Sequence, residues 1–217
     1  LLRMPLFFLV AGYGAALVLQ RRGVAGLARQ RVRRILVPFL VAWPIVHLSI
    51  AAATTWAAEN ITHASPLLLM LREWLAMPDP PTLPPATGHL WFLYYLLLFF
   101  VLHWTGRTLE LGGLLDRWLA RGPVWTALSL PLLLWPAFAL TQAPHPAPES
   151  LLPQFWAIGV YGPFYALGVA LHGRLDMLDA LRRWLLPAAP LCLIAYAIFL
   201  LQIDAGLSHA NAGWSTA

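Results

Sequence analysis

Charged side chains are scarce in this chain: 11% of its 217 residues are Asp, Glu, Lys or Arg, while 60% are hydrophobic. Soluble domains typically carry about 25% charged and roughly 45–50% apolar residues. The hydrophobic excess extends along the whole chain, which excludes a soluble domain with a single anchor. The composition instead predicts an all-α, polytopic membrane helix bundle.

Lysine is absent, so all fourteen basic residues are arginines. They gather in a few short segments, a pattern typical of membrane orientation, and despite a formal net charge of +5 we expect no nucleic-acid partner. The single cysteine, Cys192, cannot form an internal disulfide and lies in an apolar run. The sequence has no P-loop, no H-E-x-x-H, no C-x-x-C and no dinucleotide-binding glycine fingerprint, so no metal is expected.

Six apolar stretches approach the length of about 20 residues that a spanning helix needs. They cover residues 1–20, 35–56, 89–104, 124–140, 152–171 and 185–203. None contains an acidic residue, which argues against a cation-coupled transporter. In the first stretch, Gly12 and Gly14 are candidates for close packing against a neighbouring helix. The linker 57–88 holds a short apolar segment, 66–77, that we expect at the interface or against the bundle.

The connections between these stretches differ sharply in arginine content. Segments 21–34, 105–122 and 172–184 together carry twelve arginines, whereas the alternate connections carry only Arg72. The positive-inside rule therefore places the three arginine-rich loops in the cytoplasm and the linker 57–88, the loop 141–151 and the tail after residue 203 outside. Two of the cytoplasmic loops contain amphipathic helical patterns, at 111–120 and 175–185, which we expect on the headgroups.

Two arginines stand out in the first of these loops, Arg31 and Arg34 in RQRVRRILVPF. Their R-x-x-R spacing puts both guanidinium groups on one face of a helix that opens the second span. A guanidinium is a rigid fork of donors suited to phosphate oxygens, so the pair could hold the phosphates of a nucleotide-like donor. The alternative is that they only set orientation, although the loop holds more arginine than orientation requires.

The segment GHLWFLYY, residues 88–95, carries the candidates on the outward side. His89 could act there as a base or a ligand, because histidine titrates near neutral pH. Trp91 begins an aromatic group, with Tyr94 and Tyr95, that could form a wall for a sugar. Aromatic rings also anchor helices at membrane surfaces, so that role is the alternative. We take His89 and Trp91 as the candidate catalytic residues.

Three further histidines lie within or beside predicted spans. His47 falls inside the second stretch, where an ionisable group is a functional candidate, and the equal alternative is a hydrogen bond to a neighbouring helix carbonyl. His103 and His172 lie at the ends of spans, where an interfacial position is the ordinary interpretation.

Four segments occur along the chain in this order: MPLFFLVAGYG (4–14), RQRVRRILVPFL (29–40), GHLWFLYYLLLF (88–99) and YGPFYALGVALHGR (161–174). Together they resemble the membrane acyltransferase 3 family, and within it the branch typified by glucan biosynthesis protein C. The R-x-x-R with ILVPF behind it and the HLWFL segment are specific in combination, though neither is specific alone. The resemblance extends over nearly the whole chain, as one domain of residues 1–217.

This resemblance implies a multi-pass protein of the bacterial inner membrane that moves an acyl group from cytoplasmic acyl-CoA to a carbohydrate acceptor outside. The nearer branch implies succinyl-CoA as donor and a glucan as acceptor, with membrane lipid as the surrounding partner. Arg31 and Arg34 match the motif thought to engage the donor's phosphates. His89 and Trp91 match the H-L-W segment that faces the acceptor.

The resemblance also sets what this chain is expected to lack. The family fold has about ten spans, and its catalytic histidine belongs to a helix ahead of the MPLFF segment. Residues 1–217 are therefore expected to be a piece without the first and the C-terminal helices, inactive alone, in which no residue inherits the role of base. The competing classes are a transporter or flippase, which would use the same arginines to attract a phosphate headgroup, and a structural subunit.

Overall fold

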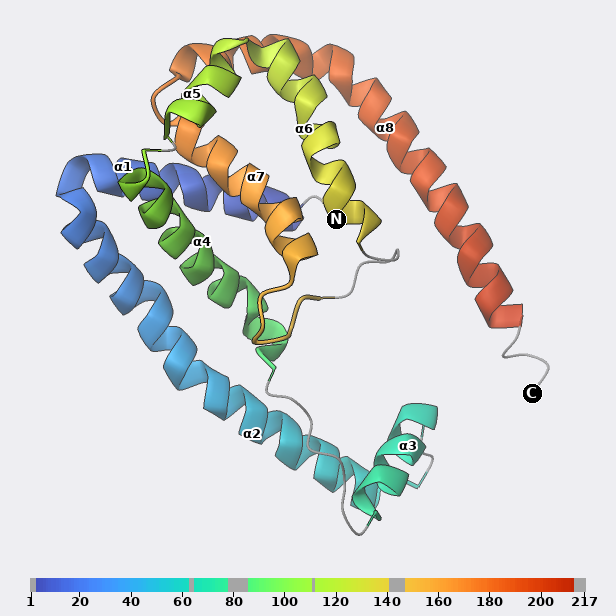
Figure 1. Cartoon of the computed structure of the whole chain (residues 1–217). Coiled ribbons are helices and arrows are strands. Elements are labelled where there is room, and N and C mark those ends of the chain that lie inside the picture. The colour runs from blue at the N-terminus through green and yellow to red at the C-terminus, as the bar shows by residue number, and fades with distance from the viewer. Residues whose placement is uncertain (1–2, 63–64, 78–85, 111, 141–146, 213–217) are drawn as a thin grey trace. The chain divides into compact units, whose positions relative to one another are not determined.

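The computed structural model describes residues 3–62, 65–77, 86–110, 112–140 and 147–212. The chain divides into two compact units, residues 1–172 and 173–217, and each is described by itself. In chain order the helices of the first unit are α1 (Arg3–Arg31), α2 (Val37–Asn60), α3 (Pro66–Leu75), α4 (Trp91–Thr108), α5 (Gly112–Ala120), α6 (Pro123–Ala139) and α7 (Phe155–Leu171) (Figure 1). A π-helical turn, η1 (Val32–Leu36), joins α1 to α2, and a 3-10 turn, η2 (Gly88–Leu90), leads into α4. The predicted all-α class is confirmed.

Helix α1 changes direction sharply at Gly23, where φ is 65° and ψ is −175°. Glycine adopts this conformation without the steric cost that a side chain would bring. The chain turns back beyond it, so that Nη2 of Arg31 donates to the carbonyl oxygen of Ala11 at 3.2 Å. The predicted loop 21–34 therefore needs correction: it is helical on both sides of Gly23 and runs through η1 into α2. Its Ala, Leu, Gln and Arg residues favour helix, and one glycine suffices for the turn.

Helix α3 is attached to the end of α2. It begins with Ser65 as its N-cap, whose hydroxyl accepts from the backbone N–H of Leu68 at 3.4 Å. Arg72 donates to the carbonyl oxygen of Ala58 at 2.6 Å and also to that of Ile61. The one arginine on the predicted outward side thus has a local structural role. Residues 78–85 of the predicted linker lie outside the described residues.

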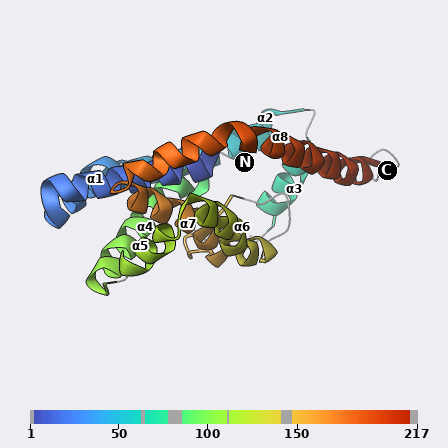
Figure 2. The same cartoon turned by 90° about the horizontal axis from the view of Figure 1, so that it is seen from above.

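Helices α1 and α7 cross at a close approach that two glycines permit (Figure 1, Figure 2). A Cβ atom added to Gly12 would collide with the carbonyl group of Tyr165, and one added to Gly168 would collide with that of Leu9. Small residues at such crossings let membrane helices pack backbone against backbone. The packing role predicted for Gly12 is confirmed, whereas a Cβ on Gly14 would meet no atom of another described part of the chain within 4 Å.

Aromatic side chains fill the space between α1, α4 and α7. Phe8 and Tyr95 are fully buried, and Phe99 and Trp91 are nearly so. The ring of Phe8 meets that of Phe99 edge-on at 5.3 Å and lies 5.0 Å from that of Tyr161, distances at which ring quadrupoles attract. This aromatic core packs against the first half of α4, from Trp91 to Phe99.

Large hydrophobic side chains also cover the outside of the helices. Leu132 and Trp135 on α6 are 73% and 75% exposed, and Leu48 on α2 is 70% exposed. Soluble proteins rarely expose apolar surface on this scale, whereas a lipid-facing surface requires it. By length and composition the stretches Arg3–Asn60 and Gly88–Thr108 could cross a membrane, and the apolar helices α6, α7 and Leu186–Ile198 are shorter. These features fit a helical membrane bundle.

The second unit is formed by one long helix, α8 (Leu175–Ala212). The sequence predicts a surface segment, 175–185, followed by a separate span, 185–203. The structure corrects this division, because the helix is continuous through residue 185 and through Pro187 and Pro190. A change from mixed to apolar side chains alters what the helix faces without ending the helical conformation of its backbone.

Candidate functional site

The two predicted donor-binding arginines stand in different surroundings. Arg31 ends α1, and its half-buried guanidinium donates to the Ala11 carbonyl while its Nε is buried without a hydrogen-bond partner in the described part of the chain. Arg34 lies three residues further on, within η1, and is exposed. Arg31 therefore holds the return of α1 in place, and Arg34 is open to a ligand.

A polar cluster lies at the C-terminal end of α4. Nδ1 of His103 is 3.5 Å from the hydroxyl of Tyr165 on α7, and the two rings meet edge-on at 6.0 Å. Arg107 follows His103 by about one helical turn, so both side chains leave the same face of α4. Arg31 lies close enough to act electrostatically on His103 and Tyr165. Three basic groups thus gather at this end of α4.

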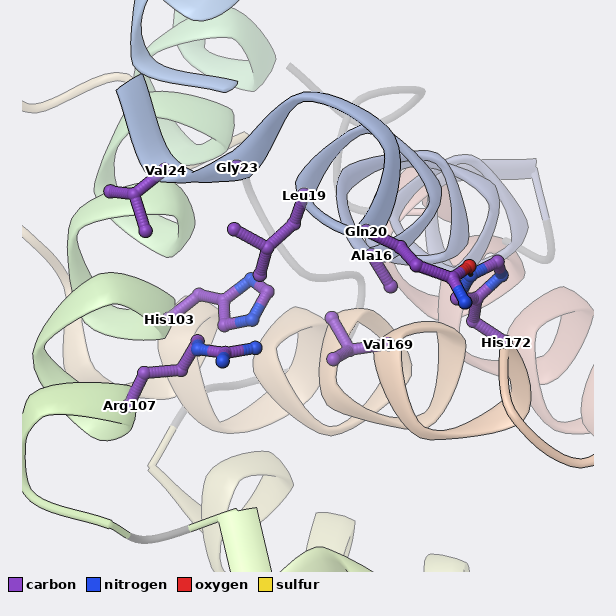
Figure 3. A pocket seen from close by; sticks show the side chains of 9 residues that line it. All are labelled: Ala16, Leu19, Gln20, Gly23, Val24, His103, Arg107, Val169 and His172. Atoms are coloured by element: carbon purple, nitrogen blue, oxygen red, sulfur yellow. Dashed lines mark hydrogen bonds between the residues drawn. The ribbon is translucent and has the colours of Figure 1, made fainter. Parts of the chain in front are cut away.

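A pocket of about 490 Å³ opens between α1, α4 and α7 at this same end (Figure 3). Its lining consists of Ala16, Leu19, Gln20, Gly23, Val24, His103, Arg107, Val169 and His172. Figure 3 shows His103 and Arg107 reaching from α4 toward Val169 on α7, with Gln20 and His172 on the far side. Because α1 breaks at Gly23, residues from both sides of the break line one pocket.

Gln20 and His172 form one wall of this pocket. Nε2 of His172 lies 2.8 Å from Oε1 of Gln20, so in this amide orientation the ring nitrogen donates and the amide oxygen accepts. The imidazole also meets the ring of Tyr13 edge-on at 5.1 Å. These contacts with α1 fix the orientation of a side chain that caps the end of α7.

The opposite end of α4 is held by hydrogen bonds to the segment that precedes α7. The fully buried Thr87 donates through its backbone N–H and, at 2.8 Å, through Oγ1 to the carbonyl oxygen of Glu149. The hydroxyl of Tyr94 donates to the carbonyl oxygen of Leu151 at 2.7 Å. These hydrogen bonds hold the start of α4 against the segment that leads into α7.

His89 and Trp91 lie at this end of α4 but face different surroundings. His89, in η2, is exposed. Trp91 is only 8% exposed, and its ring lies 5.5 Å from that of Tyr161 and 6.4 Å from that of Phe8. Trp91 thus supports the start of α4 from within the aromatic core, and its ring does not form an open wall for a sugar.

His47 lies beside the turn that carries His89. Its Nδ1 is 3.1 Å from the carbonyl oxygen of Trp43, one turn earlier in its own helix and not in a neighbouring one. Nε1 of Trp43 donates to the carbonyl oxygen of Ala86 at 2.9 Å, and a Cβ atom added to Gly88 would lie 3.8 Å from Cε1 of His47. The structure therefore brings His47 to the same turn as His89, on the side that the sequence predicts to face outward.

The predicted donor and acceptor residues are not brought together. Of the predicted donor residues, Arg31 acts electrostatically on His103, at the far end of α4. His89 precedes α4, and His103 lies fourteen residues later, a rise of about 21 Å at about 1.5 Å per residue. Helix α4 itself has 18 residues and so extends about 27 Å, close to the roughly 30 Å of a bilayer's hydrocarbon core. The polar features divide into two groups at opposite ends of α4.

A family model described as an acyltransferase domain matches residues 1–215. The chain belongs to the acyltransferase 3 family. No curated protein and no solved structure matches it. Family membership together with the apolar helices makes this chain a membrane acyltransferase in general terms, while its assignment to the glucan branch stays a prediction.

Sequence reasoning missed two residues of this acyltransferase's pocket. His103 was predicted to be interfacial and Arg107 to be one of the orientation arginines, yet both line the pocket. Their four-residue spacing on one helix was a usable signal, because it places a second basic pair on one face. The contribution of Gln20 and His172 had no local signal, since 152 residues separate them.

Proposed function

We propose that this chain forms part of a membrane-bound O-acyltransferase of the bacterial inner membrane. The enzyme moves an acyl group from cytoplasmic acyl-CoA to a carbohydrate, glucan-like acceptor on the outer side. Membership of the acyltransferase 3 family supports the transfer chemistry. The observation that carries the two-sided arrangement is the basic pocket at one end of α4 and the exposed His89 at the other.

The donor side is the basic end, where the positive-inside rule also places the cytoplasm. Arg34 is exposed there and makes no hydrogen bond to another described residue, so its guanidinium is free for phosphate oxygens. Arg31 is engaged with Ala11, and we assign it a positioning role for the turn at Gly23.

Transfer requires the acyl group to travel from the basic end toward the outward end. The acceptor hydroxyl oxygen attacks the thioester carbonyl carbon while a base takes the hydroxyl proton, the C–S bond breaks, and CoA leaves as a thiolate that takes this proton back from the base to become the free thiol. The resemblance places that base on a helix ahead of Met4, and His89 and His47 lie on the acceptor side. The buried aromatic core against the first half of α4 limits the access of water to the thioester.

The test is an acyl-transfer assay in membrane vesicles that contain the complete gene product, including whatever sequence flanks residues 1–217. Labelled succinyl-CoA and acetyl-CoA are supplied on the cytoplasmic side, and label is followed into carbohydrate. We expect transfer by the wild type and at least a tenfold loss in Arg34→Ala, since a charged phosphate contact contributes about 1.5–3 kcal/mol. Arg117→Ala, an exposed arginine of α5, is the matched control and should retain activity.

Each outcome decides between the classes. The absence of transfer with every donor would overturn the acyltransferase proposal. Movement of a phosphate-bearing solute without acylation would favour a transporter or flippase. Transfer that survives Arg34→Ala would keep the reaction and remove Arg34 from the donor site.

A further inference from the structure

The pocket between α1, α4 and α7, at the proposed donor end, has the size and chemistry of a ligand site. Its volume of about 490 Å³ falls in the range of roughly 300–1,000 Å³ typical of small-molecule sites. It is built from three helices that are far apart in sequence. Apolar side chains from α1 and α7 form part of its wall, and polar groups converge on the rest.

The charge of the lining selects for an anion. Arg107, His103 and His172 are its ionisable members, and no carboxylate is among the lining residues. Arg107 is exposed and makes no ion pair or hydrogen bond to another described residue, so its guanidinium is available. A guanidinium in a pocket wall, with a histidine one helical turn away on the same helix face, matches phosphate oxygens in geometry and charge.

The apolar part of the lining selects for more than a free phosphate. Ala16, Leu19, Val24 and Val169 form a hydrophobic wall next to the basic groups. A ligand that satisfies both parts carries a phosphate group and a longer, less polar arm. Acyl-CoA has this chemistry, and so does an anionic phospholipid.

We propose that this pocket holds a phosphate group of the acyl-CoA donor, with Arg107 as its principal phosphate ligand. The proposal rests on the proposed acyltransferase function and deepens it. The wall formed by Gln20 and His172 limits the pocket on the far side, and the break at Gly23 brings Val24 against it. Arg31 is not among the lining residues and contributes by holding the turn at Gly23 through its hydrogen bond to Ala11.

The first experiment measures binding of coenzyme A itself to the detergent-purified complete protein, by calorimetry, for the wild type and Arg107→Gln. We expect binding to weaken roughly 10- to 100-fold, as one charge-assisted contact predicts. Pantetheine, which carries the arm without phosphates, should bind equally to both proteins. Arg117→Gln removes an exposed charge on α5 and should leave the affinity for coenzyme A unchanged.

A second variant tests the pocket without removing charge. Val24 is 44% exposed and lines the pocket, so Val24→Trp can fill the cavity without disturbing the core. We expect it to weaken coenzyme A binding while size-exclusion behaviour stays that of the wild type. Unchanged binding in both Val24→Trp and Arg107→Gln would overturn the assignment.

The remaining outcomes separate this inference from the proposed function. Arg107-dependent binding of coenzyme A without acyl transfer would support the pocket and overturn the reaction. Acyl transfer by a protein whose coenzyme A binding is unchanged in Arg107→Gln would support the reaction and overturn the assignment of the pocket. Short-chain phosphatidylglycerol that binds in an Arg107-dependent way, while coenzyme A does not bind, would overturn the donor assignment in favour of a lipid phosphate.

Discussion

The two ends of α4 are built differently. At the basic end, His103 and Arg107 face an open pocket whose lining comes from three helices. At the other end, Thr87 and Tyr94 fasten the start of α4 to the segment before α7 through hydrogen bonds to backbone carbonyls. At the basic end, the exposed guanidinium of Arg107 makes no ion pair with another described residue. At the other end, the polar groups of Thr87 and Tyr94 form hydrogen bonds within the fold, and His89 is exposed. The difference shows that the side chains of one end line a pocket, whereas those of the other end hold the start of α4 to the chain before α7.

The largest effect on stability is expected where α1 and α7 cross, because this crossing holds the helices that pack against both ends of α4. Gly12→Ala puts a methyl group into the carbonyl of Tyr165, and we expect it to destabilise the protein by about 1–3 kcal/mol. Gly14→Ala is the matched control, since its methyl group meets no atom of another described part of the chain within 4 Å. Thermal unfolding in detergent, followed by tryptophan fluorescence, measures the difference. Equal melting temperatures for the two variants would contradict the claim that the close crossing of α1 and α7 stabilises the fold.

A smaller effect is expected from the end of α4 that Thr87 holds. Thr87→Val keeps the shape of a fully buried side chain but removes the hydrogen bond from Oγ1 to Glu149, at a cost of about 1 kcal/mol or slightly more. The backbone N–H of Thr87 still donates to the same carbonyl. We expect a lower melting temperature and unchanged coenzyme A binding. A variant that loses coenzyme A binding at wild-type stability would show that the two ends are not separate in function.

The smallest effect is expected from Arg121, whose guanidinium lies over the ring of Trp125 at 5.3 Å. Arg121→Gln removes a cation–π contact of about 0.5–1 kcal/mol at an exposed site. It also removes one positive charge from the predicted cytoplasmic side, outside the pocket. Coenzyme A titrations should match the wild type. A loss as large as that of Arg107→Gln would mean that diffuse charge, and not the pocket, attracts the donor.

The sequence predicted the apolar helices well, because nearly every side chain of a lipid-facing helix must be apolar. It placed α6 at 124–140 and α7 at 152–171, within a few residues of the observed Pro123–Ala139 and Phe155–Leu171. It failed at the arginine-rich segment and at residue 185, where a change in polarity was taken as a change in backbone conformation. The polarity of its side chains indicates what surrounds a helix, whereas a glycine such as Gly23, which can adopt a positive φ, marks where the helix turns.

The candidate site divides in the same way. The roles proposed for Arg34 and His89 follow from motif and exposure, and they stay predictions. Trp91 shows the limit of that reasoning, because an aromatic residue at a membrane surface and one in an aromatic core look alike in sequence. Burial of its ring among Phe8 and Tyr161 decides between them.

By itself, then, the sequence determined that the chain is helical, apolar and suited to a bilayer, and its motifs pointed to the acyltransferase 3 family. These properties are local, because each depends on side chains within one helix or one short motif. Only the tertiary structure decided that Arg31 turns inward to Ala11 and that Arg107 shares a pocket with His172. Such neighbours are set by the reversal at Gly23 and the close crossing of α1 and α7, and contacts between residues far apart in the chain leave no periodic signal in its sequence.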